Sequence, residues 1–133
     1  APDGPATSFA NARRWVHRGE FARANRALET FIDVHPGHRL ISRAKFLSAK
    51  CRLGMGEFEL ARQQFERVVV EFPGTEQSNK AAFKIAMIDL MQGNRNDARR
   101  RLSALAESAD GPYTPEAAAW IGVLAEPVAE VQP

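Results

Sequence analysis

The sequence predicts an all-α protein in which helical hairpins stack into a solenoid, with three hairpins followed by one further helix. Three observations predict this fold. A repeat of about 37 residues runs through the 133-residue chain, apolar residues within each repeat are spaced by three and four positions, and glycine or a Pro-Gly pair separates the apolar segments. Such spacings place apolar side chains on one helical face, which excludes a strand assignment. One hairpin cannot bury this face alone, so its neighbours supply the core.

Each repeat is expected to contain two helices joined at a glycine. Gly19, Gly56 and Gly93 recur in the repeat register, and glycine readily adopts the positive φ needed just after a helix. Pro36 and Pro73, each followed by glycine, end the second helix of a repeat. The expected helices are 6–18, 20–34, 41–55, 57–72, 77–92, 95–108 and 115–125.

The predicted core consists of residues that recur in register. In the second helices these columns are Ala24, Ala61 and Ala98; Leu28, Phe65 and Leu102; and Phe31, Val68 and Leu105. In the first helices an aromatic column, Phe9, Phe46, Phe83 and Trp120, accompanies Ala12, Ala49, Ala86 and Val123. The aromatic column has an alternative interpretation as a peptide-binding ladder. We favour the core, because without these rings the first helices have almost nothing to bury.

The recurring Gly, Ala, Leu or Phe, and Pro positions resemble the tetratricopeptide repeat family over nearly the whole chain. More narrowly, residues 44–47, 56–61, 69–75 and 81–86 resemble its bacterial envelope branch, which includes Tol-Pal-associated periplasmic proteins and lipoproteins of outer-membrane protein assembly. The resemblance implies a right-handed solenoid that acts as a scaffold without catalysis. It also implies a periplasmic or cell-envelope location, while a cytoplasmic one stays open.

Three segments are expected along the chain. Residues 1–5 are predicted to be a flexible N-terminal segment, and residues 126–133, which mix Pro, Glu, Ala and Val, a flexible tail or linker. Between them, residues 6–125 form the repeat domain. Its predicted units are 6–40, 41–77, 78–114 and the terminal helix 115–125.

Basic residues segregate to the first helices, although the net charge is only +2. In tetratricopeptide arrays these helices line the concave groove, so the resemblance implies a basic groove that binds a protein or peptide segment, with an acidic one favoured. Its candidate residues are Arg13, Arg43, Lys50, Lys80, Lys84 and Met87. The alternative function is a nucleic-acid-associated helical repeat. Against it stand the small net charge and the lack of exposed aromatic residues among the arginines.

The sequence offers little for catalysis, and we expect no enzyme activity, cofactor or metal. His35 and His38 straddle a helix end and have no evident third ligand, so a metal site is not predicted. Cys51 is expected to be a small packing residue rather than a nucleophile. The longest apolar run is far shorter than a membrane span requires.

The last helix is expected to be a self-association edge. Residues 115–125 contain one charged side chain, Glu116, so the helix needs cover on both sides. Trp120 is predicted to face the third hairpin, leaving the side around Ile121 open. The alternatives for its cover are the Pro-rich tail, a following domain and a second copy of the chain, of which we favour the second copy and hence a homo-oligomer. The candidate residues of this self-association edge are Trp120, Ile121 and Leu124.

Overall fold

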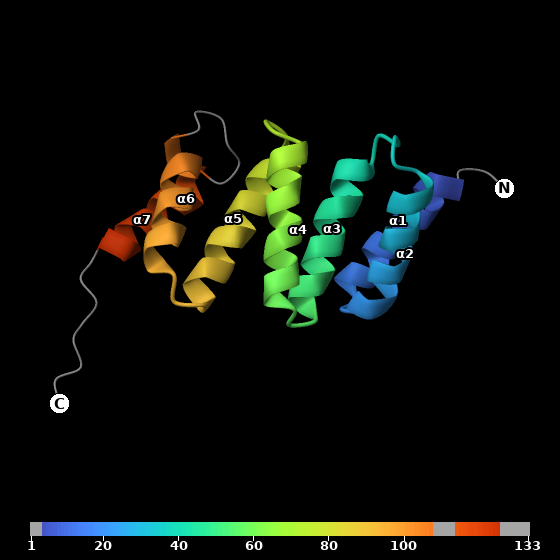
Figure 1. Cartoon of the computed structure of the whole chain (residues 1–133), viewed down its shortest axis with the longest axis horizontal. Helices are drawn as coiled ribbons and strands as arrows, with labels where there is room; N and C mark the ends of the chain where they lie inside the picture. The colour runs from blue at the N-terminus through green and yellow to red at the C-terminus, as the bar shows by residue number, and fades with distance from the viewer. Residues whose placement is uncertain (1–3, 108–113, 126–133) are drawn as a thin grey trace.

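The computed structural model describes residues 4–107 and 114–125, and within these ranges it contains seven α-helices and no strand. The helices are α1 (Gly4–His17), α2 (Phe21–Val34), α3 (Ile41–Gly54), α4 (Phe58–Glu71), α5 (Glu76–Met91), α6 (Arg95–Glu107) and α7 (Thr114–Ala125). They follow one another along the solenoid in chain order, each packed against the next (Figure 1). The predicted fold class is therefore confirmed.

The helix boundaries follow the predicted glycine and proline positions. α1 is the exception, because it begins at Gly4 rather than residue 6, and proline is well suited to the first helical turn in which Pro5 lies. Residues 4 and 5 are thus helical, whereas we expected a flexible segment. The predicted tail 126–133 lies outside the described residues. No helix of the described chain is both long and apolar enough to cross a membrane.

The turns inside the hairpins share one geometry. Gly19, Gly56 and Gly93 have φ values of 79°, 77° and 82°, which is the left-handed region that favours glycine. At the second turn, the backbone N–H of Glu57 donates to the carbonyl of Arg52 at 2.9 Å, as in a Schellman motif. The repeated turn sets the same antiparallel packing in each hairpin.

The core columns of the second helices are buried as predicted. All nine of their residues have 6% or less of their surface exposed. In the first helices Phe9 and Phe46 are also buried, and their ring centroids lie 5.9 Å from Phe31 and 5.5 Å from Phe65. These two aromatic residues are core, although Phe83 is only half-buried and 37% of Trp120 is exposed.

The prediction that Trp120 continues the aromatic column is wrong, because α7 is one residue out of the 37-residue frame. α7 packs on α6 through Ala117, Ile121 and Leu124. These residues follow Ala81, Ile85 and Ile88, which pack on α4, by 36 positions. A strict 37-residue frame would instead have turned Ala118, Gly122 and Ala125 toward α6, and all three are exposed. Burying isoleucine and leucine removes more apolar surface from water, which favours the observed rotation.

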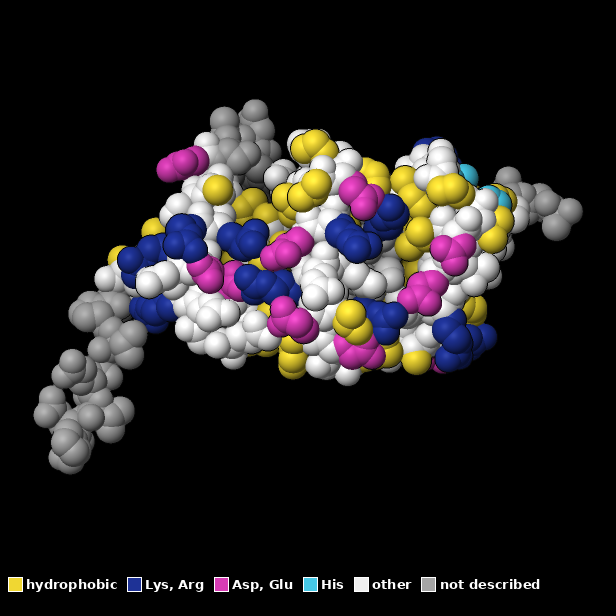
Figure 2. Space-filling model, in the orientation of Figure 1, with side chains coloured by type: hydrophobic (Ala, Val, Ile, Leu, Met, Phe, Trp, Pro, Cys, Tyr) yellow, Lys and Arg dark blue, Asp and Glu magenta, His cyan; other side chains and the backbone are white. Residues whose placement is uncertain are grey.

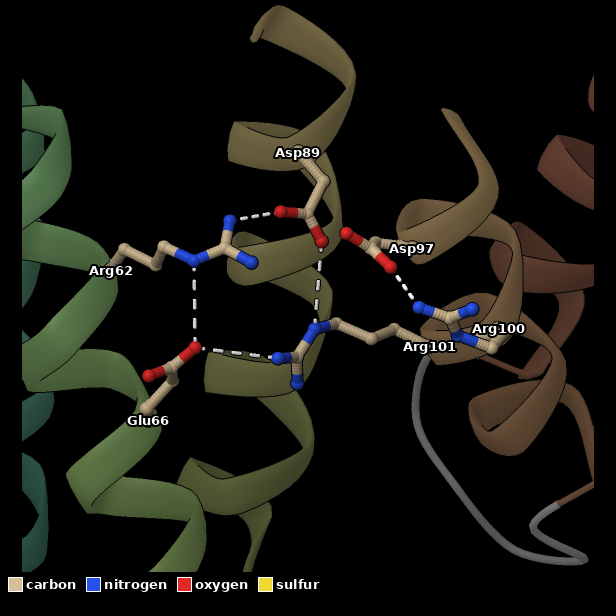
Figure 3. A network of polar contacts seen from close by, with 6 residues as sticks. All are labelled: Arg62, Glu66, Asp89, Asp97, Arg100 and Arg101. Atoms are coloured by element: carbon tan, nitrogen blue, oxygen red, sulfur yellow. Dashed lines mark hydrogen bonds and ion pairs between the residues drawn. The ribbon is translucent and has the colours of Figure 1, made fainter. Parts of the chain in front are cut away.

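A buried ion-pair network ties α4, α5 and α6 together (Figure 3). Asp89 on α5 is fully buried and accepts a hydrogen bond from the Arg62 guanidinium on α4. Arg101 on α6 places its Nε 3.5 Å from the second carboxylate oxygen of Asp89. Arg62 and Arg101 also share Glu66, at 3.5 and 3.4 Å. The hydrogen bond to Asp89 raises the pKa of Arg62 above its ordinary value.

Candidate functional site: a groove along the first helices

The first helices of the three hairpins form a groove with a cavity of about 250 Å³. Four of the six predicted groove residues, Arg13, Arg43, Lys50 and Lys80, line this cavity. The other lining residues are Phe9, His17, Phe46, Leu47, Glu76 and Gln77. Lys84 and Met87 do not line the cavity, but they lie on α5 at the repeat positions of Leu47 and Lys50, which do.

The cavity carries more positive than negative charge. Within the described residues, Arg13, Arg43 and Lys50 form no ion pair. Lys80 pairs with Glu76 at 3.0 Å, and its hydrogen bond and charge lower the pKa of Glu76. One carboxylate therefore faces four basic side chains. The cavity thus keeps an excess of positive charge that favours an anionic group on a ligand.

Lys84 adds a partly desolvated cation near the excess positive charge of the cavity. Its pKa is lowered, chiefly by burial and also by the charge of Lys50. Both effects penalise the ammonium form, because the side chain has lost water and faces a like charge. A carboxylate placed between Lys50 and Lys84 would relieve the repulsion.

The polar groove residues that the sequence prediction does not include are Glu76, Gln77 and His17, and Leu47 is an apolar one. Glu76 was placed outside the fifth helix, whereas α5 begins with it. Its spacing of four residues from Lys80 is the ion-pair spacing of a helix surface, and that signal was available in the sequence. His17 follows Arg13 by the same spacing, which places both on one face of α1.

The second helices form a different surface. A larger cavity of about 380 Å³ lies between α2 and α4, and its rim carries both signs, with Glu29, Asp33 and Glu71 against Lys45 and Arg67. Acidic and basic side chains interleave over α2, α4 and α6 (Figure 2). Because acidic and basic side chains nearly balance on this surface, the smaller cavity, with four basic side chains and one carboxylate, is the better candidate for selecting a ligand by charge.

The side chains considered for catalysis or metal binding have structural roles. His38 uses its Nδ1 to accept the backbone N–H of Leu40 at 3.1 Å, and its ring centroid lies 6.4 Å from that of His35. Burial raises the pKa of the Cys51 thiol to about 11, so the neutral thiol predominates at physiological pH. Across residues 4–107 and 114–125, no cluster of three or more His, Cys, Asp or Glu side chains could hold a metal ion.

The predicted self-association edge is only partly exposed. Leu124 is 2% exposed and Ile121 is half-buried against α6, so neither offers an open surface. Arg95 and Arg99 on α6 donate to the backbone carbonyl of Leu124 at 3.0 and 2.6 Å, which fixes the end of α7. Of the three edge residues Trp120 is the most exposed, with 37% of its surface accessible.

Comparison with known proteins identifies the fold. A sequence-family model described as a tetratricopeptide repeat-like domain matches residues 4–121. No curated protein sequence matches the chain. Three solved structures of the type III secretion translocator chaperone SycD from Yersinia enterocolitica are similar in fold, and each match covers 93% of this chain.

In one structure SycD is bound to a peptide of the translocator YopD; the match has 18% identity, a TM-score of 0.74 and covers 91% of that chain. A second has 17% identity, a TM-score of 0.77 and 85% coverage. A third, described as an alternative dimer, has 19% identity, a TM-score of 0.74 and 90% coverage. These neighbours are secretion chaperones rather than members of the envelope branch that the sequence resembles.

Proposed function

This chain belongs to the tetratricopeptide repeat-like domain family, and from that premise we propose that it is a non-catalytic scaffold that binds an extended, acidic segment of a partner protein. The segment lies in the groove of α1, α3 and α5. The observation that carries this proposal is the set of cations, Arg13, Arg43 and Lys50, that line the cavity without an ion-pair partner in the described chain. The peptide-bound SycD structure, which has a similar fold, supports a peptide as the ligand.

Binding of this kind depends on ionic strength. A rise from about 0.1 M to about 1 M salt shortens the Debye length from about 10 Å to about 3 Å. The test is fluorescence anisotropy of a labelled Asp- and Glu-rich peptide across this range. We expect affinity to fall steeply with salt, and the double variant Arg43→Glu, Lys50→Glu to slow association strongly, because charge complementarity acts mainly on the encounter rate.

A matched control separates the groove from the net charge. Arg26→Glu with Arg67→Glu makes the same change in charge on α2 and α4, where both arginines are exposed. We expect this control to bind the peptide nearly as the parent chain does. Equal losses in both double variants, or binding that ignores salt, would contradict the proposed groove.

The same assay distinguishes the alternative function. A labelled single-stranded RNA of similar charge serves as the second ligand, since a basic groove also attracts phosphates. The peptide proposal expects the acidic peptide to compete efficiently against RNA. Tight RNA binding that the peptide does not displace would favour a nucleic-acid-associated protein.

We further propose that the scaffold works in the bacterial cell envelope. Support comes from the resemblance of residues 44–47, 56–61, 69–75 and 81–86 to the envelope branch of the family. Immunoblotting of periplasmic, membrane and cytoplasmic fractions from the source cells tests this location. Recovery in the cytoplasmic fraction alone would contradict it.

A further inference from the structure

The frame shift of α7 brings a different set of side chains to the groove side of the solenoid. In α5 the positions that continue the groove are Lys80, Phe83, Lys84 and Met87, at the repeat positions of Arg43, Phe46, Leu47 and Lys50. Because α7 follows α5 by 36 residues, the corresponding α7 residues are Glu116, Ala119, Trp120 and Val123. All four are exposed.

The chemistry of the groove therefore changes along its length. α1 and α3 contribute mainly basic side chains beside Phe9 and Phe46, and α5 contributes Lys80 and Lys84 together with the apolar Met87. On α7 the large residues are apolar, with 37% of Trp120 and 56% of Val123 exposed. Glu116 in its first turn is the only charged residue of α7. The groove changes from basic to apolar toward the C-terminal end of the array.

α7 holds these two apolar side chains on a fixed support. Ala117 and Leu124 are buried against the residues of α6, and the Arg95 and Arg99 guanidinium groups both bind the carbonyl of Leu124. Ala86 on α5, Leu102 and Leu105 on α6 and the two α7 residues belong to one buried cluster. Met87, one of the groove positions of α5, packs against this same cluster, so the end of the basic part and the apolar side chains of α7 rest on one buried support.

We propose that the groove extends onto α7 and that its ligand is one extended segment with two parts, an acidic stretch over the cations of α1 and α3 that form no ion pair within the described chain and an aromatic or aliphatic side chain against Trp120 and Val123. This inference rests on the proposed groove function. If each step from α3 to α5 and from α5 to α7 is taken as about 8 to 10 Å, the spacing of packed helices, α3 and α7 are about 16 to 20 Å apart along the groove. An extended peptide advances about 3.3 Å per residue, so about five or six residues separate the two parts.

The experiment compares two synthetic peptides on the full chain. One carries four acidic residues, a spacer of about five Gly and Ser residues and a phenylalanine, and the other has alanine in place of the phenylalanine. Trp120 is the fluorescence probe in a Trp15→Phe background, which removes the other tryptophan. We expect the phenylalanine peptide to bind about tenfold more tightly and to shift Trp120 emission to the blue, because apolar surface leaves water on both sides.

Two variants test whether the affinity advantage of the phenylalanine peptide arises at α7. Val123→Lys should remove the tenfold advantage while leaving the affinity for the alanine peptide nearly unchanged. Val70→Lys is the control, since Val70 is 79% exposed on α4 and lies on a second helix rather than in the groove. A Val123→Lys chain that keeps the full advantage would overturn the inference.

The remaining outcomes separate the two proposals. If both peptides bind equally and salt still weakens them, the apolar extension is refuted and the basic groove stands. If neither peptide binds, both proposals fail. Sedimentation velocity provides the last discriminator: a dimer that Val123→Lys converts to a monomer, with equal binding of the two peptides, would make this surface an interface between copies of the chain and overturn the inference.

Discussion

The α2–α3 and α4–α5 interfaces use equivalent repeat positions with different chemistry. In the first, the Ser48 hydroxyl donates to Asn25 Oδ1 at 2.6 Å, and Arg52 pairs with Glu29 at 2.9 Å. The equivalent residues of the second interface, taken 37 positions later, are Ile85 for Ser48, Arg62 for Asn25 and Asp89 for Arg52. Neutral hydrogen bonding and an exposed ion pair have been replaced by an apolar contact and a buried charge network.

The difference between the two interfaces also changes how tightly the neighbouring helices pack. Beside the first interface, Ser48 on α3 and Gln64 on α4 line the open cavity of about 380 Å³. Their equivalents, Ile85 and Arg101, are respectively fully buried and bonded across to Asp89 and Glu66. The same backbone repeat therefore accepts either neutral hydrogen bonds or a buried charge network at this interface. The buried network makes the stability of the α4–α5 interface depend on one carboxylate, that of Asp89.

The largest expected effect is at that carboxylate. Asp89→Ala should lower the free energy of unfolding by about 3 to 5 kcal/mol, because it removes the buried carboxylate and leaves the partly buried Arg62 and Arg101 with only the more exposed Glu66. Urea unfolding followed by circular dichroism measures the change. Asp97→Ala is the control, since Asp97 pairs only with the exposed Arg100 at this network's edge, and it should cost less than about 1 kcal/mol. Similar losses in both variants would show that burial of Asp89 is energetically unimportant.

The second largest effect is a loss of stability at high pH that arises at Cys51 of the α2–α3 interface and has no counterpart at the α4–α5 interface. Folding raises the pKa of Cys51 from 9.0 to about 11, mainly through burial, whereas its counterpart Ile88 cannot titrate. Between pH 9 and 11 the folded chain holds a proton that the unfolded chain has released, so stability is full below pH 9 and falls as the pH rises. The loss approaches about 2 to 3 kcal/mol. Urea midpoints of Cys51→Val across this range should lack that component, and parallel curves for the two chains would contradict it.

A smaller change is expected at the buried hydrogen bond of the first interface. Ser48→Ala leaves Asn25 Oδ1 without its buried donor, which should cost about 1 to 3 kcal/mol. Asn25→Ala together with Ser48→Ala should cost less than the sum of the single changes, because the second substitution removes a group that is already unpaired. Strict additivity in urea unfolding would mean that water replaces the missing partner.

The smallest effect is at the exposed pair. Glu29→Gln removes a carboxylate whose side chain is 48% exposed and leaves Arg52 paired with Glu57 at 2.8 Å. We expect a loss of about 0.2 to 1 kcal/mol that disappears at high salt. Thermal unfolding at low and high ionic strength measures it, and a loss larger than that of Ser48→Ala would reverse the ranking of the two contacts.

The sequence was sufficient to predict the helices and the columns of the second helices, because their apolar spacing and the glycine turns are local signals. Four of the six predicted groove residues line the basic cavity, because the segregation of charge selected the first helices and the family resemblance assigned these helices to the groove. The rotation of α7 could not be predicted from a constant 37-residue period. It depends on which side chains pack on α6: Ile121 and Leu124 do so, and Gly122 and Ala125 remain exposed. The Asp89 network was missed because its partners lie on two other helices.

The alternation of charge between the two interfaces also makes the hairpins non-interchangeable. If the α3–α4 hairpin were duplicated in tandem, Arg52 of the second copy would occupy the position of Asp89 and would face Arg62 of the first copy. Two guanidinium groups would then meet where a carboxylate is now fully buried. An engineered array built by copying this hairpin would require a compensating change at one of those arginines, and a gene that lengthened by such a duplication would meet the same requirement.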